Sequence, residues 1–160
     1  MRREFAKFIS ETVKKDKTIQ LLSLDGPGYG LFNELLEENP YNYNNFGVTE
    51  QSSIGISSGM ALEGLKPYVY SITPFVLERP FEQIKLNIIH QKANVKLIGF
   101  WNYPNDGVTH KTEDVRGVCK VLKMDLFEPR NSKETREILE ETYKSKIPAF
   151  ISLTKDSKIK

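Results

Sequence analysis

The residues Ile19-Gln20-Leu21-Leu22-Ser23-Leu24 are followed directly by Asp25-Gly26-Pro27-Gly28. The first six form an apolar run with the length of one strand, and the Gly and Pro residues then interrupt regular structure. Apolar runs of this kind are typical of strands that are buried on both faces, as in parallel sheets. We therefore predict a buried strand that ends in a loop at Asp25.

The same alternation of apolar runs and helical patterns continues along the chain. Further strands are predicted over 67–72, 95–100, 123–127 and 147–153. Apolar periodicity and helix-start signals predict helices over 5–13, 31–36, 50–62, 77–88 and 112–120, and a last helix that starts at 131. Strands alternating with helices predict a three-layer, doubly wound α/β fold, in which a mostly parallel sheet has helices on both faces.

The composition restricts the class of protein. The chain has 160 residues, which is enough for one domain with a core of its own. Its 23 basic and 21 acidic residues give a net charge of +2, so the sequence has no electrostatic footprint for nucleic acid or for an anionic membrane. Since no apolar stretch has the length of a signal peptide or a membrane span, we expect a soluble, cytoplasmic protein.

Cysteine and histidine are rare in this chain. The single cysteine, Cys119, excludes an internal disulfide, and its apolar neighbours predict a buried, unreactive thiol. The two histidines are His90, late in a predicted helix and expected to be structural, and His110. These three residues are too far apart to match a metal-ligand spacing, and we expect no metal to be held by this chain alone.

Ligands of parallel α/β sheets bind beyond the carboxyl ends of the strands. The loops predicted at this edge cover 25–30, 48–53, 73–79 and 101–110. The first of them is no dinucleotide fingerprint, because Leu31 stands where G-x-G-x-x-G requires its third Gly and Pro27 removes a backbone donor. A turn with special backbone angles is the better interpretation of this loop.

Two polar residues in these loops are candidates for chemistry. Glu50 lies at a predicted helix start, beside free backbone N–H groups. It is either a first-turn acid that complements the helix dipole or a functional carboxylate. His110 follows Asp106-Gly107-Val108-Thr109 and is either a proton shuttle or substrate donor, or an ordinary surface or capping histidine.

The order of the motifs along the chain resembles the central, pyrimidine-binding domain of transketolases and deoxyxylulose-phosphate synthases. The similarity extends over about residues 18–154 and rests on a collinear series of motifs. These are Asp25-x-x-Gly28-Tyr29-Gly30-Leu31-Phe32, Pro40, Asn45-x-Gly47-Val48-x-Glu50-Gln51, Ser58-Gly59-Met60-Ala61-Leu62-Glu63-Gly64, Pro74-Phe75, Arg79-Pro80-Phe81-Glu82-Gln83-Ile84, Asp106-Gly107-x-Thr109-His110-x-x-Glu113-Asp114 and Pro148-Ala149-Phe150-Ile151.

The resemblance implies a thiamine-diphosphate-binding fold and a role for Glu50. In that family the cofactor lies across an interface, and the pyrimidine domain holds the aminopyrimidine ring. The family's acid maps onto Glu50, which would hydrogen-bond the ring nitrogen opposite the exocyclic amine. That bond favours the imino tautomer, which takes the proton from the thiazolium carbon and leaves the ylid that attacks a ketose or keto acid.

The resemblance also assigns the remaining site residues. Phe75 and Phe81 match the aromatic wall against the pyrimidine, with Phe75 the favoured contact and Phe81 the better candidate for core packing. Arg79 would contact the cofactor or the substrate, unless it is only a solvated helix end. Asp106 and His110 match positions that approach the substrate. The loop before them, Phe100 to Asn105, is bulkier than the glycine-rich loop usual in the family.

The family's diphosphate motif, Gly-Asp-Gly with a later Asn, does not occur in this sequence, and neither does its C-terminal domain. We therefore expect residues 1–160 to be a single pyrimidine-binding domain, the small subunit of a split transketolase-like enzyme that transfers a two-carbon ketol unit between sugars or sugar phosphates. A larger partner subunit would hold the diphosphate and its Mg²⁺ or Ca²⁺, in a heterotetramer that is a dimer of heterodimers. The alternatives are a subunit of a two-component 2-oxo acid decarboxylase or dehydrogenase, and a non-catalytic interaction domain.

Overall fold

The computed structural model describes residues 1–24, 30–100, 107–112 and 114–154. They form a six-stranded sheet with the order β2-β1-β3-β4-β6-β5, in which every pair of neighbouring strands is parallel. The strands are β1 (Ile19–Ser23), β2 (Tyr43–Asn45), β3 (Lys66–Ile72), β4 (Lys96–Phe100), β5 (Asp125–Phe127) and β6 (Ala149–Leu153).

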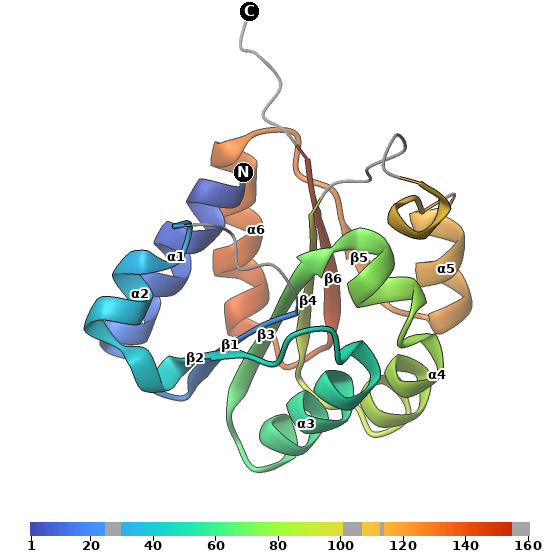
Figure 1. Cartoon of the computed structure of the whole chain (residues 1–160), viewed down its shortest axis with the longest axis horizontal. Helices are drawn as coiled ribbons and strands as arrows, with labels where there is room; N and C mark the ends of the chain where they lie inside the picture. The colour runs from blue at the N-terminus through green and yellow to red at the C-terminus, as the bar shows by residue number, and fades with distance from the viewer. Residues whose placement is uncertain (25–29, 101–106, 113, 155–160) are drawn as a thin grey trace, which may run out of the picture.

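Helices cover both faces of the sheet (Figure 1). One face carries α1 (Arg2–Lys15), α2 (Asn33–Glu38) and α6 (Ser132–Lys144). The other carries α3 (Glu50–Leu62), the helical segment η2 (Pro74–Glu78), α4 (Phe81–Gln83) and η3 (Ile84–Ile89), and α5 (Val115–Leu122). Two single turns, η1 (Pro40–Asn42) and η4 (Val108–His110), complete the helical elements of the described ranges. The predicted three-layer α/β architecture is confirmed.

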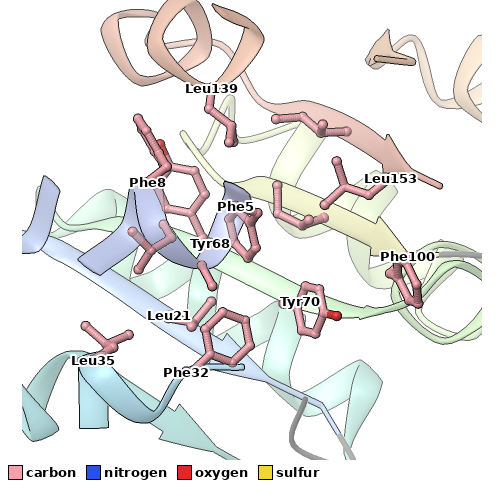
Figure 2. Packing of buried hydrophobic residues seen from close by; sticks show 14 of the residues in the cluster. Phe5, Phe8, Leu21, Phe32, Leu35, Tyr68, Tyr70, Phe100, Leu139 and Leu153 are labelled. Carbon is pink, nitrogen blue, oxygen red and sulfur yellow. The ribbon is translucent and has the colours of Figure 1, made fainter. Parts of the chain in front are cut away.

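The core is divided into two clusters by the sheet. In β3, Tyr68 and Tyr70 belong to the cluster under α1 and α6, whereas Val69, between them, belongs to the cluster under α3 and η3. Figure 2 shows the first cluster, in which the ring of Phe5 stacks on Tyr70 with 5.6 Å between centroids. Because both faces of each central strand are buried, both sets of alternating side chains are apolar, as the sequence predicts.

The local signals at the ends of α3 and at the start of α6 are confirmed. Helix α3 begins at Glu50 and ends at Leu62, and Gly64 follows with a φ of 90° that its missing side chain permits. At the start of α6, Asn131 Oδ1 accepts a hydrogen bond of 2.9 Å from the backbone N–H of Glu134. Helix α5 begins at Val115, later than predicted, because the side chain of Asp114 caps it.

The helix predicted over 77–88 has a different form in the structure. Two π-helical turns, η2 and η3, flank the short α4. The backbone N–H of Arg79 bonds to Pro74 O at 3.1 Å, five residues back. Pro80 has no N–H to donate, so a regular α-helical ladder is interrupted at this point. The apolar stripe is nevertheless correct, since Leu77, Ile84 and Ile88 are fully buried.

Other sequence expectations concern burial and membrane association. Cys119 is buried, as predicted, and burial raises the pKa of its thiol to about 11. His90 is exposed at the end of η3. Within the described ranges, no helix has the length and apolar character needed to cross a membrane.

Candidate functional site

The candidate site lies at the carboxyl edge of the sheet, where the direction of strand succession reverses. From β1 the chain moves outward to β2, then returns across β1 to β3 and continues to β4 on the other side. In doubly wound folds this reversal separates the loops and creates a ligand-binding crevice. Two polypeptide segments meet here: the start of α3 and the π-helical turn η2 that follows β3.

Glu50 is the first residue of α3, and its side chain is only 8% exposed. Its Oε1 accepts a 2.6 Å hydrogen bond from Nη1 of Arg79, which lies 29 residues further along the chain. A carboxylate at a helix start is favoured by the helix dipole. Here the carboxylate is also buried and paired with a cation from another loop, so its position reflects tertiary structure as well as the dipole.

The turn η2 places Phe75 and Arg79 together. The π-helical hydrogen bond from Arg79 N to Pro74 O widens this turn. The guanidinium carbon of Arg79 lies 3.4 Å from the centroid of the Phe75 ring, in a cation–π contact. Phe75 itself is buried, with 5% of its surface exposed. Arg79 therefore touches both an acidic and an aromatic member of the predicted site.

His110 reaches the same aromatic ring from the turn η4. Its imidazole meets the Phe75 ring edge-on, with centroids 5.1 Å apart and an interplanar angle of 61°. Its Nδ1 lies 3.0 Å from the hydroxyl of Thr109. Glu50, Arg79, Phe75 and His110 thus form a continuous series of contacts, drawn from three separate segments of the chain.

Two other predicted site residues stand apart from this series. Phe81, in α4, is half-buried and packs against the core cluster between the sheet and α3. That placement agrees with its position on the apolar stripe, and its contact with a cofactor remains a prediction. Asp106 lies outside the described residues, and its approach to a substrate also remains a prediction.

Sequence reasoning selected the members of the site but not how they pair. The Glu50–Arg79 ion pair joins two loops that are adjacent only in the folded sheet. In the sequence, the pair is indicated only by the opposite charges of two residues predicted at the same edge. Gln51 adds a weak link, with its Nε2 3.4 Å from Arg79 O. On the other face of the same edge, Arg2 donates to Tyr70 Oη at 2.7 Å and lies over Phe100. Nothing in the sequence pattern indicated this arginine.

The geometry suits a flat heterocycle with N–H donors. A buried carboxylate and an aromatic ring face lie side by side, and the planar, N–H-bearing guanidinium of Arg79 already contacts both of them. An aminopyrimidine is also flat, and in its imino tautomer the ring nitrogen opposite the exocyclic nitrogen carries an N–H, so the residues present fit it. Across the described ranges, no three His, Cys, Asp or Glu side chains lie close enough together to bind a metal ion.

Comparison with known proteins gives a family and several relatives. The family model described as the transketolase pyrimidine-binding domain matches residues 1–158. One of the subunits of apulose-4-phosphate transketolase from Phocaeicola vulgatus is 28% identical over 142 residues, which are 86% of this chain and 46% of that protein. A 6-deoxy-6-sulfo-D-fructose transketolase subunit of a Clostridium species is 26% identical over 157 residues, 96% of this chain and 49% of that subunit.

A solved structure shares the fold. It is described as a split gene transketolase in an inactive beta4 tetramer, and it superposes with a TM-score of 0.86 at 24% identity. The match covers 98% of this chain and 51% of that one. The chain therefore spans about half the length of the curated relatives and of the structure that it matches.

Proposed function

Because this chain belongs to the transketolase pyrimidine-binding domain family, we propose that it is the small subunit of a split transketolase-like enzyme and supplies the glutamate that activates thiamine diphosphate. The observation that carries the proposal is the buried carboxylate of Glu50 beside the ring of Phe75, with a planar N–H donor already in contact with both. The match to subunits of two-part transketolases supports it.

The proposal assigns a role to each site residue. Glu50 hydrogen-bonds the aminopyrimidine ring and Phe75 stacks on it, while Arg79 and Phe81 border the same space. His110, whose imidazole lies against Phe75, and Asp106 contact the substrate, with His110 able to move a proton. When bound, thiamine diphosphate supplies a nucleophilic carbon for addition to a carbonyl group. This chain contributes the acid that prepares the ring and the walls that orient it.

A partner subunit completes the site in this proposal. Residues 1–160 contain no Gly-Asp-Gly diphosphate motif, and we propose that the partner holds the diphosphate and its Mg²⁺ or Ca²⁺. In the proposed assembly, the chain is one pyrimidine-binding domain in a dimer of heterodimers. We propose two-carbon ketol transfer between sugars or sugar phosphates, in the cytoplasm. The relatives' names refer to a phosphorylated and a sulfonated sugar, which supports a substrate with an anionic end.

The test is reconstitution of ketol transfer with the diphosphate-binding partner. Glu50→Gln keeps the size of the side chain and removes the carboxylate, and we expect it to lower the rate at least about 100-fold, in the range of a lost acid–base group. Glu63→Gln, at the exposed far end of the same helix, is the matched control and should leave the rate unchanged. An unaltered rate in Glu50→Gln would contradict the proposal, and release of carbon dioxide from 2-oxo acids would replace ketol transfer by decarboxylation.

A further inference from the structure

We infer that Arg79 is a latch that closes the pyrimidine site of this chain by occupying it. The guanidinium lies where the aminopyrimidine ring has to lie, and the site opens only when the Arg79 side chain swings aside. The inference rests on the proposed function of Glu50 and Phe75 and goes beyond it, because it concerns the state of the site before the cofactor arrives.

The two contacts of Arg79 are the two that a bound pyrimidine requires. Its Nη1 donates to Glu50 Oε1 at 2.6 Å, and its guanidinium carbon lies 3.4 Å from the Phe75 ring centroid. At that separation the guanidinium is in van der Waals contact with the ring, which leaves no space for a second flat group between them. With Phe75 only 5% exposed and His110 against its edge, the ring offers little other surface to a ligand.

The chemistry of the two groups explains why they compete. A guanidinium is planar and delocalised, carries N–H donors in its plane and stacks on aromatic faces. An aminopyrimidine is also planar, carries a ring N–H opposite its exocyclic nitrogen in the imino tautomer, and stacks on the same kind of face. Since both groups need the carboxylate of Glu50 and the same face of Phe75, they compete for one position.

The structure also shows how the latch can move. The Arg79 side chain is 34% exposed, so a change of side-chain rotamer can carry the guanidinium into solvent. Its backbone is fixed by the N–H bond to Pro74 O and by Gln51, which donates to its carbonyl oxygen. Opening therefore requires no movement of η2 or α3. The apparent affinity for the pyrimidine is reduced by the fraction of chains that are open.

The latch is tested by titrating the full chain with thiamine, which carries the aminopyrimidine ring without the diphosphate, and following binding by NMR or calorimetry. We expect Arg79→Ala to bind thiamine at least about tenfold more tightly than the unmodified chain, because the closed fraction is removed. Arg79→Lys, which keeps the charge and loses the planar stack, should fall between the two. Arg116→Ala, which breaks an exposed ion pair with Glu128, is the matched control and should change nothing.

The outcomes separate the latch from the proposed function. Equal, weaker or undetectable thiamine binding by a folded Arg79→Ala chain would overturn the latch, as would a gain that survives the further change Glu50→Gln. Melting curves verify that each variant is folded. In the reconstituted complex, tight thiamine diphosphate binding that does not increase in Arg79→Ala would overturn the latch alone. A complex that binds no cofactor at all would overturn the proposed function.

Discussion

At the carboxyl edge of the sheet, the buried carboxylate of Glu50 has as its charged partner the guanidinium of Arg79, which is one-third exposed. At the amino edge, the buried ammonium of Lys96, the first residue of β4, is only 3% exposed. Its Nζ donates to Asn94 Oδ1 at 2.5 Å, to Ser145 O at 3.3 Å and to Ile147 O at 2.5 Å. Both edges bury a charge, but the partner of Glu50 is a partly exposed side chain, whereas two of the three partners of Lys96 are backbone carbonyls.

We interpret this difference as one between a charge that is available for function and one that holds the fold together. Two acceptors of Lys96 are backbone carbonyls of the turn between α6 and β6, so the ammonium ties β4 to that turn. Arg79 is the donor to Glu50 among the described residues, and in our proposal another flat donor takes its place without altering the backbone. Parallel sheets bind ligands at their carboxyl edge, and the contrast places the exchangeable charge at that edge.

The largest effect on stability is expected at Lys96, the buried charge at the amino edge. Lys96→Ala removes a buried side-chain stem and leaves two backbone carbonyls without their donor, so we expect the free energy of unfolding to fall by about 3 kcal/mol. Urea denaturation measures this change. Lys92→Ala, an exposed lysine near the same edge, is the control. A loss below that of Glu50→Gln would show that the contrast between the two edges is wrong.

A pH dependence should follow from the same lysine. Burial lowers the pKa of Lys96 from its ordinary value of 10.5 to about 8 in the folded chain. Between these values the unfolded chain holds a proton that the folded chain has released, so the stability contribution of Lys96 rises as the pH is raised from 8 to 10.5. We expect a rise on the order of 2 kcal/mol, measured as the difference between the unmodified chain and Lys96→Met.

The stability of Lys96→Met has to be subtracted from that of the unmodified chain because a second buried group changes stability with pH in the opposite direction. Burial raises the pKa of the Cys119 thiol to about 11. Between the ordinary pKa of a thiol and this value, the unfolded chain has lost a proton that the folded chain keeps. The contribution of Cys119 to stability therefore falls as the pH rises through this range. Cys119 is common to both chains, and its effect cancels. A stability difference that stays flat or falls between pH 8 and 10.5 would contradict the account of Lys96.

The smallest stability effects are expected at the exchangeable pair. Glu50→Gln breaks an ion pair whose remaining partner, Arg79, is partly exposed, and we expect a loss below about 1 kcal/mol. Thermal unfolding of the single variants Glu50→Gln and Arg79→Ala and of the double variant measures both this loss and the coupling of the pair. A coupling energy of several kcal/mol would mean that the pair is a structural element, and the site could not then exchange Arg79 for a ligand.

The sequence was sufficient for the architecture because the central strands are buried on both faces and read as apolar runs. Strand β2 was missed, since Tyr43-Asn44-Asn45 lies at the sheet edge and has no apolar pattern. The π-helical turns were missed as well, because apolar spacing reports which face is buried and not which hydrogen-bond ladder forms.

The candidate site was predictable in its members but not in its contacts. Glu50, Phe75, Arg79 and His110 were selected through their motifs, and the structure brings them together. The pairing of Glu50 with Arg79 depends on the approach of two loops across the sheet, which no local pattern encodes. Lys96 illustrates the same limit, since a lysine within an apolar run gives no indication of the three oxygen atoms that surround it.

We propose that this chain holds only the pyrimidine half of a shared cofactor site. Calorimetric titration of thiamine diphosphate with Mg²⁺ into this chain, into the diphosphate-binding partner and into their mixture tests it most directly. We expect tight binding in the mixture alone, and loss of that binding gain when the chain carries Glu50→Gln. Tight binding by this chain without its partner, or no gain on mixing, would contradict the division of the site between two subunits.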